Sequence, residues 1–380
     1  MKKNIYGLLL LTAAGVWSAC TPSTQSDGSI STLETDGNKL TLCDFNKVTD
    51  TLSVPLSEWV EDCQLVRFEN SDTALFKLWW PAITDRYIGI RQSGAVFKLF
   101  DREGKFLNDI GAMGQGPGEY AGSLYSEAID EKNRCVYLAP FFGSNKILKY
   151  NLDGTFASVI ELGETLNKPK LHLHPDGSLS VTHLCFKGRN EMMVAHIAPD
   201  GTLTSYKPTA EQIINPMDKD GNFVGFNNEI WSYNNTENFN FMTMPTDTLY
   251  QYNPEQNRVT ARFALQNPPK GKDVFLIYNE LPGKFLATVW GTGTIAIDLQ
   301  KQQSHYVKLV NDYFGGLPTP MNFTNGYFFA MYEPLVLMDK IEERLSASGC
   351  TDKDKEVLNK LLDSLDENDN NVMFIGKLKH

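Results

Sequence analysis

Short alternating runs of hydrophobic and polar residues recur along most of the chain, and a polar turn follows each run. The clearest runs lie at 96–100, 147–150, 193–197, 249–252 and 294–297. The turns begin at Asp101, Asn151, Ala198, Asn253 and Asp298, which are 50, 47, 55 and 45 residues apart. Alternation is typical of half-buried strands, and a repeat of this length built from short strands is typical of a β-propeller. The pattern predicts an all-β fold with one four-stranded blade per repeat.

The two ends of the patterned region predict how the ring of blades closes. The last apolar repeat is split into one strand at 326–331 and a second at 372–377. We expect the final strand to share a blade with an N-terminal strand at 65–68, which follows a short helix or turn beginning at Leu56. Closure of this kind removes the unpaired edges at which open sheets aggregate. The sequence therefore predicts a six-bladed β-propeller over residues 51–380.

Between the two halves of the last blade the hydrophobic period changes from two to nearly four. Leu337, Ile341 and Leu345 share one helical face, and a second amphipathic stretch runs from 352 to 365. Gly349 stands between the two stretches, where it suits the end of a helix. We expect a helical hairpin inserted in the last blade at about 335–366.

The N-terminal segment differs from the rest of the chain. Lys2 and Lys3 precede an apolar stretch at 5–16, and Ala19 stands immediately before Cys20. This arrangement predicts a lipoprotein signal peptide at 1–19 and a lipid on Cys20, which would place the protein in the outer membrane, facing the periplasm or the cell surface. An ordinary cleaved signal peptide and a retained anchor are the alternatives. The polar residues that follow predict a flexible tether at 20–50.

Charge and cysteine content exclude several classes of protein. The chain has a net charge of −11, and removal of Lys2 and Lys3 leaves 33 basic against 46 acidic residues, a net charge of −13. Nucleic acid is therefore not an expected partner, because its phosphates require basic surfaces. The five cysteines beyond Cys20 are widely spaced and contain no CxxC pair, which excludes a zinc ribbon. We expect a monomer.

Residues 110–120 form the most unusual stretch: Ile-Gly-Ala-Met-Gly-Gln-Gly-Pro-Gly-Glu-Tyr. It lacks the Lys-Ser/Thr ending of a phosphate-binding loop. Together with the Phe-Asp-Arg-Glu-Gly-Lys-Phe turn at 100–106 and Asp-Asn-Asn-Val at 369–372, it resembles the six-bladed β-propeller lipoproteins of Bacteroidetes-type bacteria. The resemblance implies an exported, membrane-anchored propeller and brings no catalytic residues with it.

We expect this glycine-rich loop, residues 111–120, to cross a propeller face near the mouth of the central channel. Its glycines allow tight chain reversal, and Glu119 is expected to accept backbone hydrogen bonds. The predicted role is mainly structural, with Gln115, Glu119 and Tyr120 as candidates for ligand contact. Trp79, Trp80 and Trp231 are further candidates, because aromatic rings recognise sugars and peptides.

Three histidines form the alternative candidate site. His172 and His174 share one face of a predicted strand, and His183 follows in the same blade, so the three imidazoles could bind zinc or calcium. The simpler interpretation is a polar strand edge without a cofactor. No motif of a hydrolase or metalloprotease is present. The predicted function is therefore a non-catalytic module of the cell envelope that binds a glycan, a peptide or an envelope protein. The alternative is a metal-dependent lyase or hydrolase.

Overall fold

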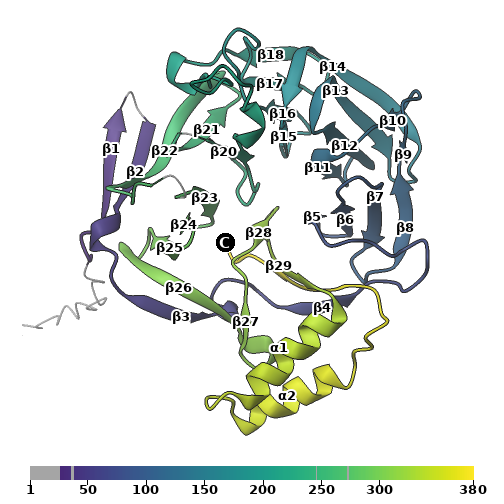
Figure 1. The fold of residues 1–380 in the computed structure, drawn as a ribbon, viewed down its shortest axis with the longest axis vertical. Helices are drawn as coiled ribbons and strands as arrows, with labels where there is room; N and C mark the ends of the chain where they lie inside the picture. The colour runs from purple at the N-terminus through teal and green to yellow at the C-terminus, as the bar shows by residue number, and fades with distance from the viewer. Residues whose placement is uncertain (1–25, 36–37, 245, 272–273) are drawn as a thin grey trace, which may run out of the picture.

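The computed structural model describes residues 26–35, 38–244, 246–271 and 274–380, and it confirms the six-bladed β-propeller (Figure 1). Six sheets, each built on four antiparallel strands, surround a central axis, and the first strand of each blade lies nearest that axis. Blade one comprises β5 (Trp80–Ile83), β6 (Tyr87–Arg91), β7 (Phe97–Asp101) and β8 (Phe106–Ile110). Blade two comprises β11 (Leu124–Asp130), β12 (Cys135–Pro140), β13 (Phe142–Asn151) and β14 (Phe156–Asn167).

The remaining blades follow the same order along the chain. Blade three comprises β15 (Lys170–Leu173), β16 (Leu179–Thr182), β17 (Val194–Ile197) and β18 (Leu203–Tyr206). Blade four comprises β19 (Ile230–Trp231), β20 (Phe239–Thr243), β21 (Leu249–Asn253) and β22 (Arg258–Gln266). Blade five comprises β23 (Leu276–Leu281), β24 (Lys284–Val289), β25 (Gly293–Asp298) and β26 (Gln303–Asn311). Blade six comprises β28 (Phe323–Thr324), β29 (Tyr327–Tyr332), β30 (Val372–Lys377) and β4 (Gln64–Arg67).

Because the strands within a blade are antiparallel, the turns of each blade divide between two faces of the ring. Turns between first and second strands, and between third and fourth strands, lie on one face, which we call the pocket face. Turns between second and third strands, and the connections from one blade to the next, lie on the other, which we call the opposite face. The short runs and turns that repeat in the sequence are the third strands and the third-to-fourth turns.

In two blades, steric constraints explain why the repeated turn contains glycine. Gly104 and Gly154 have φ of 89° and 84°. A Cβ on Gly104 would lie 2.3 Å from the carbonyl oxygen of Arg67 in β4, and one on Gly154 would lie 2.2 Å from that of Asp109 in β8. Only glycine accommodates both the backbone conformation and the close approach. The turn thus packs against the outer strand of the preceding blade.

The ring closes through strands from the two ends of the chain, as predicted. β4 pairs antiparallel with β30, with Val66 opposite Met373 and Arg67 opposite Val372. Leu56–Glu58 forms the short 3-10 helix η2 expected ahead of this strand. Side chains of blades six and one then share one buried cluster that includes Val66 and Met373.

The tether predicted at 20–50 is wrong for much of its length. Ile30–Thr35 and Asn38–Asp44 form the antiparallel strands β1 and β2, and β2 pairs in parallel with β22 at the outer edge of blade four. β3 (Thr51–Pro55) likewise adds to β26 of blade five. Backbone hydrogen bonds to an existing edge order a strand that has few large apolar side chains, and Cys43 supplies a fully buried contact. Residues 20–25, including Cys20, lie outside the described residues.

Two helices, α1 (Pro334–Ser346) and α2 (Asp352–Leu362), stand in the chain between β29 and β30 and lie outside the ring (Figure 1). Leu337, Ile341, Leu358 and Leu361 are buried in one cluster with the neighbouring blades. No helix in the described part of the chain is long and apolar enough to cross a membrane. The shorter elements are η1 (Phe45–Lys47), β9 (Ala112–Met113), β10 (Glu119–Tyr120), η3 (Ala210–Gln212), η4 (Gly225–Asn227), η5 (Asp312–Phe314) and β27 (Leu317–Thr319).

Candidate functional site

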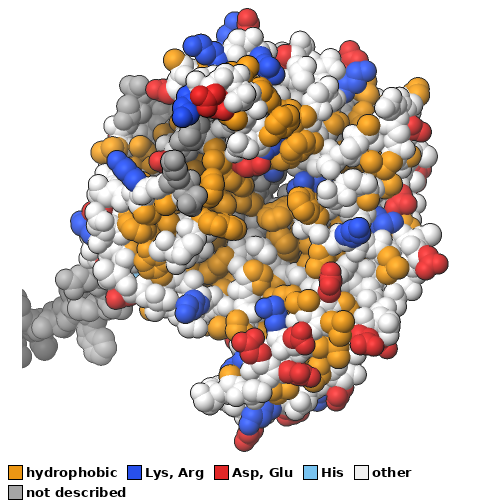
Figure 2. All heavy atoms as spheres, in the orientation of Figure 1, with side chains coloured by type: hydrophobic (Ala, Val, Ile, Leu, Met, Phe, Trp, Pro, Cys, Tyr) orange, Lys and Arg blue, Asp and Glu red, His pale blue; other side chains and the backbone are white. Residues whose placement is uncertain are grey.

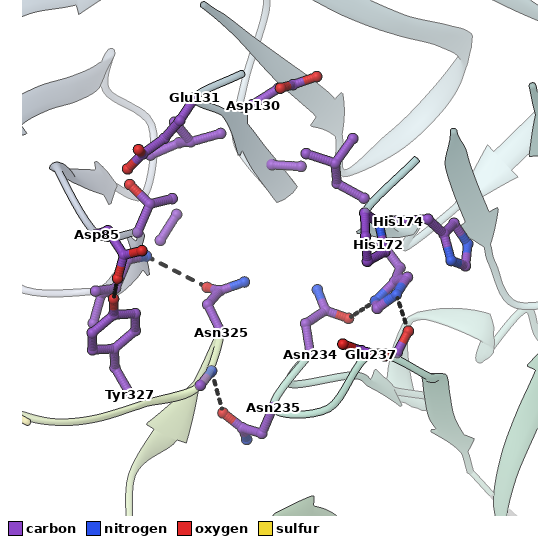
Figure 3. Close-up of a pocket in the computed structure, with 18 of the residues that line it drawn as sticks. Asp85, Asp130, Glu131, His172, His174, Asn234, Asn235, Glu237, Asn325 and Tyr327 are labelled. Carbon is purple, nitrogen blue, oxygen red and sulfur yellow. Dashed lines mark hydrogen bonds between the residues drawn. The ribbon is translucent and has the colours of Figure 1, made fainter. Parts of the chain in front are cut away.

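A cavity of about 520 Å³ opens at the centre of the pocket face (Figure 3). We call it the central pocket. Turns between first and second strands of five blades form most of its wall, and residues of the adjoining strands, Lys377 and His380 also line it. These turns contribute Thr84, Asp85, Glu131, Lys132, His174, Pro175, Gly177, Asn234, Asn235, Thr236, Glu237, Asn325 and Gly326. Hydrogen-bonding groups from separate repeats therefore converge on one space.

Both ring nitrogens of His172 face hydrogen-bond acceptors, and a neutral imidazole donates to only one of them. Its Nδ1 lies 2.9 Å from Asn234 Oδ1, and its Nε2 lies 3.0 Å from the carbonyl oxygen of Glu237. The Asn234 amide group donates to the carbonyl oxygen of Leu171 at 2.9 Å, which turns its oxygen toward the imidazole. The ring also stacks on Phe239 with 5.1 Å between centroids. Burial lowers the pKa of His172, and the two acceptors oppose that shift only in part.

His174 belongs to a local network within blade three. Its Nε2 lies 2.8 Å from Ser180 Oγ, and the same oxygen lies 3.0 Å from His196 Nδ1. Burial, reinforced by His172 and His196, lowers the pKa of His174 to about 4. His174 is therefore uncharged at neutral pH and offers the pocket a neutral polar edge.

The three histidines predicted as a metal site do not meet. His172 and His174 have ring centroids 4.5 Å apart, but His183 is fully buried beyond the end of β16, where its Nε2 lies 3.2 Å from Glu164 Oε1. Its Nδ1 accepts a hydrogen bond from the Asn167 backbone at 3.4 Å. Among the residues that the structure describes, no group of three His, Cys, Asp or Glu side chains is arranged to hold a metal ion.

The wall facing His172 carries paired charges. Asp85 Oδ1 accepts hydrogen bonds from Tyr327 at 2.5 Å and from Lys377 Nζ at 2.7 Å. These contacts, Lys377 first, lower the pKa of Asp85. Arg86 donates through its backbone and its Nε to Glu131 at 2.7 and 2.8 Å. The carboxylates of Asp85 and Glu131 are thus fixed in place and keep acceptor capacity for a ligand.

Asn325 presents the clearest free donor. It has φ of 53°, as does Asn234 on a neighbouring turn, a conformation that asparagine tolerates better than most residues. Its Oδ1 lies 3.5 Å from the backbone nitrogen of Ile83, while its Nδ2 donates to no described residue. Figure 3 shows that Nδ2 directed into the cavity. Asn325 is therefore available to bind a ligand oxygen.

The glycine-rich loop lies at the outer rim rather than near the channel mouth, and the expected position is wrong (Figure 1). It packs against the outer strands of blade two: Tyr150 donates to the carbonyl oxygen of Gly118 at 2.9 Å. Tyr120 is buried, and its hydroxyl donates to the Ile110 carbonyl and accepts from Phe97 N, both at 2.9 Å.

The remaining loop candidates also lie at the rim. Glu119 accepts a hydrogen bond from Gly116 N at 2.8 Å, which agrees with the expected structural role, and Gln115 is exposed. The connection stays at the rim because it packs against the neighbouring blade. None of these residues lines the central pocket.

The predicted tryptophans are also outside the pocket. Trp80 packs edge-on against Phe329 at 5.1 Å between centroids, and Trp231 packs against the core between blades four and five. Trp79 is 57% exposed, in the connection that leads to β5. By its position in the chain it belongs to the opposite face.

The opposite face carries most of the exposed large hydrophobic residues outside the strands. Leu75, Trp79, Met217, Phe226, Phe275, Trp290, Leu335 and Val336 all lie in its turns and connections or at the start of α1. Figure 2 shows this face, with hydrophobic side chains gathered around a central hollow. Of the exposed large hydrophobic residues in the described chain, none lies in a turn of the pocket face. The two faces therefore differ in chemistry.

Sequence reasoning missed most of the pocket. Asp85, Glu131, Asn234 and Asn325 stand within three residues of the end of a first strand, and His380, which belongs to no motif, also lines the cavity. Alignment of the repeats on their first turns, rather than on the more regular third-to-fourth turns, would have brought these polar residues into register.

Comparisons with known proteins agree with this architecture. The family described as "Domain of unknown function (DUF4934)" matches residues 40–377. The crystal structure of a "Putative exported protein" from Bacteroides fragilis NCTC 9343 has a TM-score of 0.59 at 15% identity, over 88% of this chain and 99% of that one. This likeness shows the fold. A search of curated proteins returns no match.

Two weaker structural likenesses support no argument about function. The WD40 β-propeller domain of Doa1 has a TM-score of 0.36 at 11% identity, over 63% of this chain and 71% of that one. An auxiliary nutrient binding protein from Bacteroides ovatus ATCC 8483 has a TM-score of 0.37 at 11% identity, over 63% and 62% of the two chains.

Proposed function

The chain belongs to the DUF4934 family, and we propose that it is an exported propeller that binds a hydroxyl-rich ligand, such as a glycan, in the central pocket without catalysing a reaction. The observation that carries this proposal is the convergence of amide, carboxylate and imidazole groups from five blades on one cavity of about 520 Å³. Binding pockets fix a ligand through a few well-placed polar groups.

The donors and acceptors in the pocket suit a sugar. Each sugar hydroxyl both donates and accepts a hydrogen bond, and the pocket offers the Asn325 Nδ2 donor and the Asp85 and Glu131 acceptors. His172 and Asn234 contact each other, so they shape the wall and supply its rigidity. A volume of about 520 Å³ falls within the ~300–1,000 Å³ of small-molecule sites.

The binding test uses an array of neutral and acidic oligosaccharides, followed by calorimetry with the strongest binder. The variant Asn325→Gly removes the side-chain donor and keeps a residue that accepts φ of 53°. We expect it to weaken binding about 2- to 10-fold, since one hydrogen bond contributes ~0.5–1.5 kcal/mol.

Gln115→Ala, at the outer rim, is the matched control and should bind as the wild type does. Absence of any glycan ligand, or equal affinity in the wild type and Asn325→Gly, would contradict the proposal.

We also propose that a lipid on Cys20 anchors the protein to the outer membrane. The support is the basic and apolar leader that ends at Ala19-Cys20. β1 begins at Ile30, ten residues after Cys20, so the tether spans at most ~35 Å when fully extended. The propeller would therefore remain near the membrane surface.

Membrane fractionation and fatty-acid labelling test the anchor. Wild-type protein should incorporate labelled fatty acid and sediment with membranes, whereas Cys20→Ala should do neither. Membrane retention of the variant, with no label in the wild type, would show that a different anchor is used.

A further inference from the structure

A second set of polar groups lies near the centre of the ring, toward the opposite face. It comes from the end of β6, the first half of β11, the start of β15 and the segments before β15 and β19, and its members are Arg91, Tyr125, Glu127, Lys168, Lys170 and Glu229. A hydrogen bond of 3.0 Å from Leu171 N to Ser126 Oγ shows that β11 and β15 lie side by side here. None of these six residues lines the central pocket.

The two carboxylates of this set already have cationic partners. Glu127 Oε2 lies 2.7 Å from Arg91 Nε, and both side chains are buried. Glu229 accepts hydrogen bonds from Lys168 Nζ and from the Tyr125 hydroxyl. Lys168 also donates to two backbone carbonyl oxygens at 2.9 and 2.7 Å. Each negative charge is therefore matched by one positive charge.

Lys170 is the third cation, and it has no such partner. Its Nζ lies 4.4 Å from the centroid of the Tyr125 ring. It makes no hydrogen bond and no ion pair with any residue in the described part of the chain. Burial and the nearby charge of Arg91 lower the pKa of Lys170 to about 7, against the attraction of Glu127 and Glu229. The protein thus places one uncompensated ammonium group inside the ring.

We propose that Lys170 is the centre of a second binding site, inside the ring and separate from the central pocket, that takes the carboxylate of a small acidic molecule. One unpaired cation calls for one negative charge, whereas a phosphate dianion would bring an excess charge into a poorly solvated space. Arg91 lies close enough to add attraction, and the Tyr125 ring forms an apolar wall for the rest of the ligand. The site does not depend on glycan binding in the central pocket.

The pH dependence of binding follows from the same group. Only the protonated form of Lys170 pairs with a carboxylate, so binding takes up a proton when the free site is partly neutral. With a pKa of about 7 in the free protein, the protonated fraction falls about tenfold between pH 6 and pH 8. The affinity should fall by the same factor.

Calorimetry on the mature protein tests the site, with sodium glucuronate as an acidic sugar, sodium acetate as a free carboxylate, and glucose and sodium chloride as controls. We expect binding of glucuronate or acetate, about tenfold weaker at pH 8 than at pH 6, with proton uptake revealed by different heats in different buffers. Binding of acetate alone would identify free small carboxylates as the ligand class; binding of glucuronate would extend it to acidic sugars.

Two variants test separately whether binding needs a positive charge at position 170 and whether titration of Lys170 causes the pH dependence. Lys170→Met should abolish carboxylate binding, and Lys170→Arg should retain it without the loss between pH 6 and pH 8, because arginine stays charged. Lys146→Met, on β13, controls for the loss of a lysine at the surface, and melting curves confirm that each variant is folded. Retained binding in Lys170→Met, no binding of either glucuronate or acetate beyond the heat given by glucose, or an equal effect of chloride and acetate would overturn the proposal.

Discussion

The glycine-rich loop and the central pocket are opposites in how they appear in the sequence and in what they do. The loop at 111–120 is the most conspicuous motif of the chain, yet it packs at the outer rim, where Tyr120 is buried and Tyr150 holds the Gly118 carbonyl. The pocket comes from short turns with no motif among them, such as those at Asp85 and Asn325. An unusual local sequence here reflects an unusual backbone path, whereas the site reflects convergence of ordinary residues.

This contrast follows from propeller geometry. Every first-to-second turn points toward the same end of the axis, so five of the six blades contribute residues to a common space without any local signature. The rim loop must instead fit one irregular connection against one neighbouring blade, and that fit selects particular glycines. The experiments below separate the two roles.

The largest loss of stability should come from adding a side chain at Gly118, where the loop packs against Phe156. Gly118 has φ of 74°, and a Cβ there would lie 2.5 Å from the Phe156 ring. We expect Gly118→Ala to lower the free energy of unfolding by roughly 2–4 kcal/mol through backbone strain and overpacking. Ligand binding by the folded fraction should not change. Chemical denaturation and calorimetry measure both quantities.

Gly122→Ala provides the control for the clash. Gly122 has the same φ of 74°, but a Cβ added there would have no atom within 4 Å, so only backbone strain of roughly 1 kcal/mol is expected. If Gly118→Ala and Gly122→Ala destabilise equally, the contact with Phe156 does not contribute. Loss of ligand binding with normal stability would assign the loop a functional role.

A substitution in the pocket wall should lower the free energy of unfolding by less than Gly118→Ala does. Asn234→Gly keeps a residue suited to φ of 53° but removes the partner of His172 and of the Leu171 carbonyl. Leaving these buried groups unpaired should lower the free energy of unfolding by ~1–3 kcal/mol, and it should also weaken ligand binding.

Asn267 also has φ of 53°, and among the described residues its side chain donates only to the partly exposed Asp44 carboxylate. Asn267→Gly should therefore change the free energy of unfolding by less than ~0.5 kcal/mol. Equal effects of the two substitutions would show that the His172 contact is not important for stability.

Acid should weaken the fold through the pocket histidines. The pKa of His174 is lowered to about 4 by burial, so the unfolded chain binds a proton there more readily than the folded chain does. This contribution to stability is complete above pH 6.5 and is lost as the pH falls toward 4. Its slope approaches ~1.4 kcal/mol per pH unit.

Denaturation curves between pH 7 and pH 4 measure that slope. His174→Asn should reduce it. A slope that is identical in the wild type and His174→Asn would place the acid sensitivity elsewhere in the molecule.

The smallest effect should come from the exposed tip of the rim loop. Gln115 makes no hydrogen bond with a described residue, and Gln115→Ala should change the free energy of unfolding by less than ~0.5 kcal/mol. Calorimetry with the pocket ligand should give the wild-type affinity. A marked loss of binding would move the ligand from the centre of the ring to the rim.

The sequence by itself determined the architecture. Six repeats, the polar third-to-fourth turns and the closing strands at 64–67 and 372–377 were all predictable, because alternation and turn chemistry are local properties and the closure rule needs only the two ends. The first strands were less visible, since β19 and β28 have only two residues each. β1 and β2 were missed because pairing with blade four, rather than their own hydrophobicity, orders them.

The tertiary structure alone decided what the residues do. The pairing of His172 with Asn234 joins positions 62 residues apart, and that of Asp85 with Lys377 joins positions 292 apart. Lys170 is distinctive only because Arg91 and Lys168 take the two nearby carboxylates. Such relations depend on which side chains meet across the ring, and electrostatic and hydrogen-bond energies depend on that proximity and on burial. Local pattern determines the blades, whereas the sites arise from distances that exist only after the ring has closed.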